Sequence, residues 1–245
     1  NSGVHTKRYT KWKSETREYL LEVIFYTQAN SEMLNLGIVP KMASQLEDQL
    51  LRKVLHQPRT LAHLAARRGD YAVYYKNTGV NHWITATDFP PKTFRGDTPS
   101  ESTRQTILAI DTQLGRNFAL CCINSNLFFW FYTVRTNCRD LNPSDITTFP
   151  IPEGVEKDNA FSNLARSLMD SLDQNSEYIT RAQKLTGEIR MQSFFPGHSK
   201  PIIDEIDRVL ARHYGFTEAE LDFIIHYDIK YRMGRDAESE DEGAE

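Results

Sequence analysis

Residues 71–91 read YAVYYKNTGVNHWITATDFPP, and this stretch decides the fold prediction. Tyr71, Val73 and Tyr75 alternate with the residues between them, which is the period of a β-strand. A polar turn that contains Gly79 follows, and residues 82–87 are again rich in aromatic and β-branched side chains. Two such runs on either side of a turn predict a β-hairpin.

The turn of this hairpin and the loop after it are rich in side chains that hydrogen-bond to phosphates and to base edges. The candidates for nucleic-acid contact are Lys76, Asn77, Asn81, His82, Lys92, Arg95, Ser102 and Arg104. The residue types alone also fit an ordinary hairpin with a polar tip. Three aromatic residues of the same stretch, Tyr74, Trp83 and Phe89, are expected to be structural.

Outward from the hairpin, strand-like and helix-like patterns are mixed in the first part of the chain. Ser44 and Glu47 form a capping box, which marks the start of a helix with an apolar face. The residues after the hairpin include Pro, Gly and Ser, which is typical of a loop. The expected elements are strands at 18–28 and 105–111, helices at 44–55, 60–68, 114–123 and 126–135, and a loop at 88–104.

The second part of the chain has a helical pattern. From residue 156 to 193, apolar residues recur at three- and four-residue steps, which predicts helix. Pro196-Gly197 interrupts this pattern. A further helix is expected at 204–213, and the capping box of Thr217 with Glu220 opens the last one.

These patterns predict an α+β protein. We expect a small mixed-sheet recognition unit over residues 1–152, followed by a helical bundle or spacer unit over residues 153–236. The segment 237–245 is an acidic tail, which is expected to be disordered.

Composition and charge limit the classes of function. The net charge is −4, but residues 1–95 hold 14 of the 29 Lys and Arg residues and only 8 of the 33 Asp and Glu residues. This asymmetry indicates a local basic face without suggesting strong autonomous DNA binding. No apolar run approaches the ~18 residues that span a membrane. Three cysteines without a CxxC pair argue against a disulfide framework or a zinc site, and a cytoplasmic location fits.

Three further stretches join the hairpin in a resemblance to a known family. They are IVPKMASQLEDQLLRKVL at Ile38–Leu55, INSNLFFWFYTVRTNCRDLNPSDITTFPIP at Ile123–Pro152 and IIDEIDRVLARHYGFTEAELDFIIHYDIKYRMG at Ile202–Gly234. In this order they resemble the C-terminal target-recognition region of bacterial type IIG restriction-modification enzymes. The catalytic half of those enzymes is a Taq-type adenine-N6 DNA methyltransferase. The resemblance runs from about residue 38 to 234.

The resemblance implies sequence-specific recognition of double-stranded DNA. It also implies that Arg135, Asn137 and Arg139, which follow the aromatic run Phe128–Tyr132, contact phosphates or bases. The aromatic run itself is expected to be core, because on a helix its side chains point all round. The second unit would be a spacer that docks onto the catalytic domain, although a dimer-forming bundle fits the same pattern.

The catalytic motifs of such enzymes are missing from this sequence. There is no Gly-rich loop for S-adenosylmethionine, and Asp88-Phe89-Pro90-Pro91 is not the Asn-Pro-Pro-Tyr motif that holds a flipped adenine. We therefore expect no catalytic residue, no cofactor and no metal site in this chain. S-adenosylmethionine and Mg²⁺ would belong to a missing catalytic part, on the same chain or on another. The start at Asn1 rather than Met fits a fragment.

Two other interpretations of the function are weaker, a metal-dependent nuclease and a docking module. Asp228-Ile229-Lys230 with Asp222 is a D-x-K string of the kind found in metal-dependent nucleases, but the string is common. The acidic residues Asp204, Glu205 and Asp207 are expected to be a solvated helix face near an N-terminus. The main alternative function is a helical docking module, or a separate specificity subunit, without direct base contacts.

Overall fold

The structure is a computed structural model that describes residues 4–8, 26–28, 39–78, 82–102, 104–183 and 187–233. Helices and small antiparallel sheets alternate along the chain, so the predicted α+β class is confirmed. The predicted acidic tail, and the strand expected at 18–28 apart from Tyr26–Gln28, lie outside the described residues. Within the described residues, no helix is long and apolar enough to cross a membrane.

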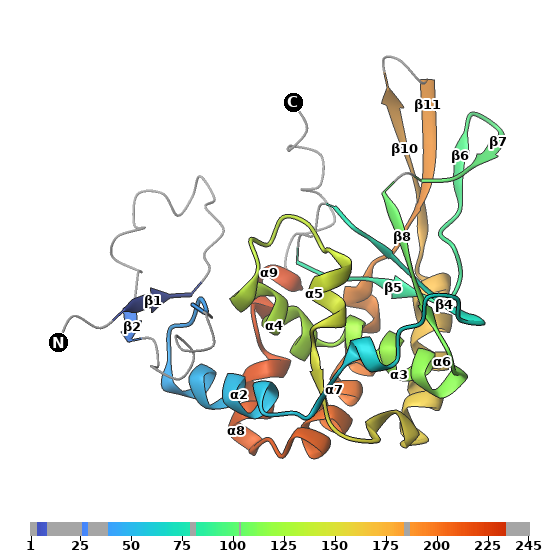
Figure 1. Cartoon of the computed structure of the whole chain (residues 1–245). Helices are drawn as coiled ribbons and strands as arrows, with labels where there is room; N and C mark the ends of the chain where they lie inside the picture. Colours follow the sequence, from blue (N-terminus) through green and yellow to red (C-terminus); the bar gives the residue numbers. More distant parts are fainter. Residues whose placement is uncertain are drawn as a thin grey trace, which may run out of the picture.

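The helices form the body of the molecule (Figure 1). They are α2 (Gln45–Leu55), α3 (Gln113–Asn124), α4 (Asn126–Arg135), α5 (Pro143–Thr147), α6 (Ala160–Gln174), α7 (Lys200–Tyr214), α8 (Glu218–Ile225) and α9 (Ile229–Arg232), with the 3-10 turns η2 (Leu61–His63), η3 (Val155–Lys157) and η4 (Pro196–Ser199). The capping box predicted at Thr217 is confirmed, because Thr217 and Glu220 bond to each other's backbone N–H at the start of α8. Ser44 caps α2 as predicted, but Glu47 accepts from the Ala43 N–H rather than from the Ser44 N–H, so the predicted box is only half formed.

The strands form four small sheets. The strands are β1 (His5–Lys7), β2 (Tyr26–Gln28), β3 (Arg59–Thr60), β4 (Tyr71–Lys76), β5 (Ala86–Thr87), β6 (Thr93–Arg95), β7 (Thr98–Ser100), β8 (Gln105–Ile110), β9 (Pro150–Ile151), β10 (Glu177–Gln183) and β11 (Gly187–Ser193). Their orders are β1-β2, β3-β9, β5-β4-β8 and β10-β11-β6-β7, and every pairing in them is antiparallel. We call the four-stranded sheet β10-β11-β6-β7 the arm.

The hairpin predicted at 71–87 is confirmed, with a shorter second strand. Tyr74 lies opposite Thr87 and Tyr75 opposite Ala86. Trp83 lies before this strand rather than within it. Its indole points to the C-terminal segment, where Nε1 donates a hydrogen bond to the Arg232 carbonyl at 3.0 Å. The strand β8 at 105–110 is also confirmed and pairs with β4 along its whole length.

The aromatic run of α4 lies in the hydrophobic core, as predicted. Every residue from Leu127 to Val134 is buried, and Trp130 is fully buried. Phe149 packs edge-on against Phe128 and Phe131, with ring centroids 5.2 and 4.9 Å apart. Such aromatic pairs add about 0.5–1.5 kcal/mol each beyond the burial of their area. The residues are therefore unavailable as a stacking surface for single-stranded nucleic acid.

Three predicted elements are wrong. Residues 60–68 form the end of β3 and the turn η2 rather than a helix, because β3 pairs with β9. The loop at 88–104 contains the hairpin β6–β7, which turns at Gly96 with a φ of 59°. The helix expected at 156–193 ends at Gln174, and the remainder is the hairpin β10–β11.

Elements from both sides of residue 152 share one sheet and one core. Strand β6 pairs with β11, so the arm combines residues 93–100 with residues 177–193. Helix α3 packs on α6, where the rings of Phe118 and Phe161 meet edge-on with centroids 5.1 Å apart. The predicted boundary at 152 therefore crosses continuous packing.

A buried polar cluster connects α4, α7 and the C-terminal segment. We call Asn126, Asp204, Asp207 and Arg232 the interior cluster. The Asp207 carboxylate accepts hydrogen bonds from the backbone N–H groups of Asn126 and Leu127, each at 3.0 Å. Arg232 donates to the side chain of Asn126, and Asn126 donates to Asp204 at 3.1 Å.

The expectation of a solvated acidic face is wrong for Asp207. Helix α7 begins at Lys200, so Asp207 lies about two turns inside it and faces the N-terminus of α4. Burial raises the pKa of Asp207 to about 6, against the hydrogen bonds from α4 that lower it. Burial also lowers the pKa of the Arg232 guanidinium to about 10. Glu205 is exposed and pairs with Arg208, as expected for a surface residue.

Candidate nucleic-acid interface

Two loops that are far apart in the sequence meet at the end of the first hairpin strand. The Asn77 N–H donates to the Arg104 carbonyl at 3.0 Å, and the Leu141 N–H donates to the Asn77 carbonyl at 3.0 Å. Thr78 forms an isolated antiparallel bridge with Asp140. The end of β4, the start of β8 and the loop after α4 are therefore hydrogen-bonded to one another. These segments carry most of the residues predicted to contact DNA.

The predicted residues that are exposed at the end of β4, the start of β8 and the loop after α4 form what we call the tip group. Its members are Lys76, Arg104, Arg135, Asn137 and Arg139, and all five are exposed. The Arg135 guanidinium lies over the ring of Phe131 at 4.7 Å from the ring centroid, which orients it at the end of α4. The loop that carries Asn137 and Arg139 is tied to α4, because the Tyr132 hydroxyl donates to the Asp140 carbonyl at 3.0 Å.

Two of the predicted residues, Ser102 and Asn137, fix local turns at this surface, whereas the side-chain oxygen of Asn77 points away from it. The Ser102 hydroxyl accepts from the Arg104 N–H at 3.3 Å, and the Asn137 side-chain oxygen accepts from the Arg139 N–H at 3.0 Å. Such bonds fix turns and so hold the two arginines in position. The side-chain oxygen of Asn77 is buried and has no hydrogen-bond partner among the described residues, so it does not face the surface.

Lys92 and Arg95 belong to the arm rather than to the tip group. Both are exposed, and Arg95 ends β6 next to the turn at Gly96. The Lys92 N–H donates to the side-chain oxygen of Gln192 at 3.1 Å, and the Lys92 carbonyl accepts from the Gln192 N–H at 2.8 Å. Gln192 in turn donates to Asp173 at 3.0 Å, at the end of α6. The base of the arm is therefore fixed to the helical body.

His82 is bonded to the C-terminal segment, and Asn81 is outside the described residues. The His82 carbonyl accepts from Arg232 Nε at 3.0 Å, and its side chain is half-buried. The backbone of His82 is thus held by the interior cluster. The hairpin signal in the sequence gave no indication of this contact, because Arg232 lies 150 residues further along the chain.

The sequence analysis missed the exposed arginines of the second half of the arm. Arg181 and Arg190 lie on β10 and β11, within the stretch that was predicted to be helix. A signal was present: Tyr178, Ile179 and Thr180 favour strand, and Gly187 follows as a turn residue with a φ of 75°. The pairing of β11 with β6, which no local pattern reveals, completes this sheet.

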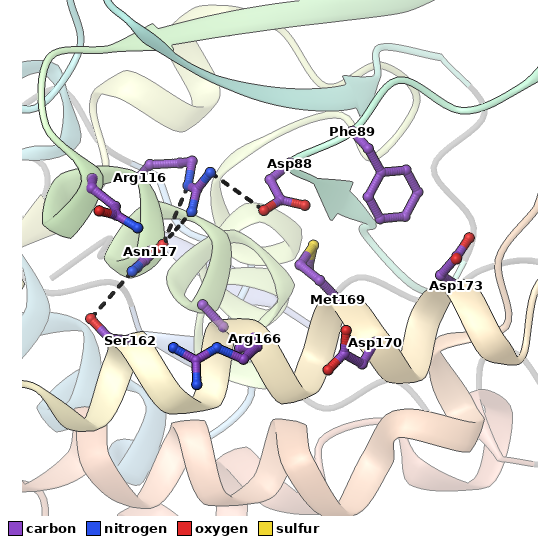
Figure 2. Close-up of a pocket in the computed structure, with 11 residues that line it drawn as sticks. Asp88, Phe89, Arg116, Asn117, Ser162, Arg166, Met169, Asp170 and Asp173 are labelled. Carbon is purple, nitrogen blue, oxygen red and sulfur yellow. Dashed lines mark hydrogen bonds and ion pairs between the residues drawn. The ribbon is translucent and has the colours of Figure 1, made fainter.

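A pocket of about 380 Å³ lies between the exit of β5, α3 and α6 (Figure 2). Arg116 crosses it, with contacts to Asp88 at 3.4 Å and to the side-chain oxygen of Asn117 at 2.9 Å. Asn117 donates to Ser162 at 3.2 Å, which links α3 to α6. Arg166 lies on the same rim.

The charges of this pocket do not suit a polyanion. The lining acids are Asp88, Asp170 and Asp173, against the two arginines Arg116 and Arg166. Arg116 is already bound by its neighbours and lies over the ring of Tyr71 at 5.5 Å. A phosphate would meet more negative than positive charge. We therefore place the candidate nucleic-acid interface on the tip group and the arm.

Neither a metal centre nor a known relative supplies a further clue. Among the described residues, no group of three His, Cys, Asp or Glu side chains could hold a metal ion. Asp228 of the D-x-K string occupies the N-cap position of α9 with a φ of 52°, and burial raises its pKa. Cys121 and Cys122 are buried and free, as expected. The chain matches no family model, no curated protein and no solved structure.

Proposed function

We propose that this chain recognises the DNA target sequence for an adenine-N6 methyltransferase of a restriction-modification system. The observation that carries the proposal is the meeting of two loops at Asn77. The residue types of the hairpin tip predict DNA contacts there, and the resemblance to type IIG target-recognition regions implies them for the loop after α4. Together these segments contribute the exposed residues of the tip group. Guanidinium and amide groups on one surface are the donors that phosphates and base edges accept.

The division of labour has a physical reason. A base methyltransferase must move its target base out of the stack, which costs a few kcal/mol. A recognition region that grips the same duplex offsets this cost and supplies the choice of sequence. Each good bidentate contact to a base edge discriminates by roughly 1–3 kcal/mol. The tip group holds three arginines, Arg104, Arg135 and Arg139, which are suited to guanine.

Chemistry would reside in a catalytic part on the same chain or on a partner chain. That part would bind S-adenosylmethionine, and Mg²⁺ if the enzyme also cleaves DNA. The complex would act in the cytoplasm, where bacterial DNA lies. Calorimetric titration of this chain with S-adenosylmethionine is expected to show no saturable binding. Binding in the micromolar range would contradict the proposed role as a reading region without catalytic function.

Binding of the chain alone to DNA is expected to be weak and sensitive to salt. The net charge of −4 opposes tight binding, while the exposed arginines provide local phosphate contacts. The logarithm of the binding constant should fall with the logarithm of salt concentration by about 0.9 per phosphate contact.

The test is an anisotropy titration of a labelled duplex of mixed sequence with the whole chain. Weak binding that weakens steeply with salt is the expected result. No binding at low salt, or binding that salt does not affect, would favour a protein-docking module without base contacts. A titration with single-stranded DNA of the same sequence is the control, because the tip group offers no exposed stacked aromatic residues for single strands.

A further inference from the structure

The arm projects from the helical body. Figure 1 shows β10 and β11 extending beyond the helices, with β6 and β7 beside them. Two strands supply its length, since β10 and β11 pair over seven residues from Glu177 opposite Ser193 to Gln183 opposite Gly187. Its base is fixed by Gln192 to the end of α6. The major groove of DNA admits a two-stranded antiparallel ribbon, such as the projecting part of β10 and β11.

One face of the arm carries a row of two arginines with an isoleucine between them. Arg181 lies opposite Ile189, and Ile189 lies opposite Arg95. Residues directly opposite one another in neighbouring strands point to the same face of a sheet. Two strand spacings separate the backbones of the arginines by about 10 Å. Both side chains are exposed, and among the described residues neither guanidinium has a hydrogen bond, an ion pair or a ring contact.

On the opposite face of the arm, the arginine is packed against aromatic rings. Arg190 lies over the rings of Phe94 and Tyr178, at 4.8 and 5.5 Å from their centroids. The two rings are themselves 5.9 Å apart. Glu188 shares this face, two residues from Arg190 on the same strand. The face is therefore stabilised internally and its positive charge is partly compensated.

We propose that the face of the arm with Arg181, Ile189 and Arg95 lies against the major groove and that its two arginines contact phosphates on either side of it. The separation of about 10 Å between their backbones is close to the groove width of about 12 Å, and the long side chains cover the difference. The inference rests on the proposed function, because it names the part of the duplex that this arm contacts. Arg190, on the other face, stiffens the arm.

The experiment compares two faces of the same sheet. The whole chain is titrated against a labelled duplex of mixed sequence over a range of salt concentrations. The variants are Arg95→Ala with Arg181→Ala as a pair, and Arg190→Ala as the matched control. The pair should lower the magnitude of the salt slope by roughly 1.8, which corresponds to two phosphate contacts. Arg190→Ala should leave the slope as it is in the wild type. Thermal melts of each variant report whether the fold is intact.

The results distinguish a failure of this inference from a failure of the proposed function. If the arm pair leaves the slope unchanged while Arg104→Ala still weakens binding, the arm is not a contact and the proposed function stands. If Arg190→Ala lowers the slope and the pair does not, the opposite face binds DNA and the inference is wrong. If the wild-type chain does not bind duplex DNA at low salt, both are wrong. If one variant melts early, Arg95→Gln and Arg181→Gln test the same contacts with better-preserved packing.

Discussion

Arginine side chains have opposite surroundings in the interior cluster and on the arm. The Arg232 guanidinium lies 3.8 Å from the centre of the Trp83 ring and 4.6 Å from that of Phe129, and it donates to Asn126 and to the His82 carbonyl. Arg95 and Arg181 have no such partners among the described residues. The comparison shows that partners, rather than residue type, separate a structural arginine from one that is available to a ligand.

Burial also changes the pKa values of the charged groups in the interior cluster. Burial disfavours charge, and it raises the pKa of Asp207 and lowers that of Arg232. The interior cluster is tolerated because hydrogen bonds from α4 and the mutual attraction of the two charges offset the desolvation. Removing one partner from such a cluster is costly, whereas removing a charge from the arm should leave the fold unchanged.

The largest expected effect is on stability, at Asp207. Replacing Asp207 with Ala removes a negative charge near the buried Arg232 guanidinium and the acceptor of the backbone N–H groups of Asn126 and Leu127. Removing one charged member of a buried, hydrogen-bonded cluster costs about 3–5 kcal/mol. Glu205→Ala on the same helix is the control, since its exposed pair with Arg208 is worth less than about 1 kcal/mol. Urea unfolding of both variants checks this, and equal effects would mean that the cluster is not structural.

A somewhat smaller effect is expected for an aromatic residue next to the cluster. Trp83→Ala should lower the free energy of unfolding by about 3 kcal/mol, because the indole packs on Arg232 and bonds to its carbonyl. Phe94→Ala on the arm should cost about 1 kcal/mol, since that ring packs mainly on Arg190 and Tyr178 at the surface. Thermal melts measure both. A larger loss at Phe94 would reverse the comparison between interior and arm.

The pH dependence of stability should also report the interior cluster. The pKa of Asp207 is about 6 in the folded protein and about 4 in an unfolded chain. Between these values the folded state binds more protons, so the contribution of Asp207 to the free energy of unfolding falls as pH rises from about 4 to 6. The fall should be on the order of 2–3 kcal/mol.

The measurement is the difference in unfolding free energy between the wild type and Asp207→Asn at several pH values. That difference isolates Asp207 from other carboxyl groups, such as Glu220, whose pKa is lowered beside Lys53 despite its burial. A difference that is constant between pH 4 and 7 would contradict the assignment.

The last prediction concerns sequence preference, where no change in stability is expected. Arg104→Ala and Arg139→Ala should leave stability unchanged and alter the bases that are enriched when the chain selects from a random duplex library. Loss of a bidentate contact to guanine should relax preference at one position by about 1–3 kcal/mol. Arg208→Ala on α7 is the matched control. Unchanged preferences in both variants would place the reading residues elsewhere, with the arm as the next candidate.

The sequence predicted the helical core better than the sheets. The helix caps at Ser44 and Thr217 and the aromatic run of α4 depend on neighbouring residues, so local patterns revealed them. The arm depends on the pairing of β6 with β11, almost a hundred residues apart in the sequence, and on short strands that resemble helical or loop patterns. Local reasoning therefore missed Arg181 and Arg190.

Predicting the candidate site was limited in the same way. The polar residues of the hairpin tip and of the loop after α4 were identified separately from their types and from the resemblance. Their meeting through Asn77 depends on tertiary hydrogen bonds to Arg104 and Leu141. The internal position of the Asn77 side-chain oxygen, and the attachment of His82 to Arg232, are likewise invisible in a single sequence.

The most direct test of DNA contact at the tip group is amide hydrogen exchange of the whole chain with and without duplex DNA. We expect slower exchange on DNA binding at residues 76–78, 102–106 and 137–141, and on the arm, with no change in α7 and α8. Slower exchange confined to α7 and α8, or no change anywhere at a concentration where the duplex is bound, would contradict the account.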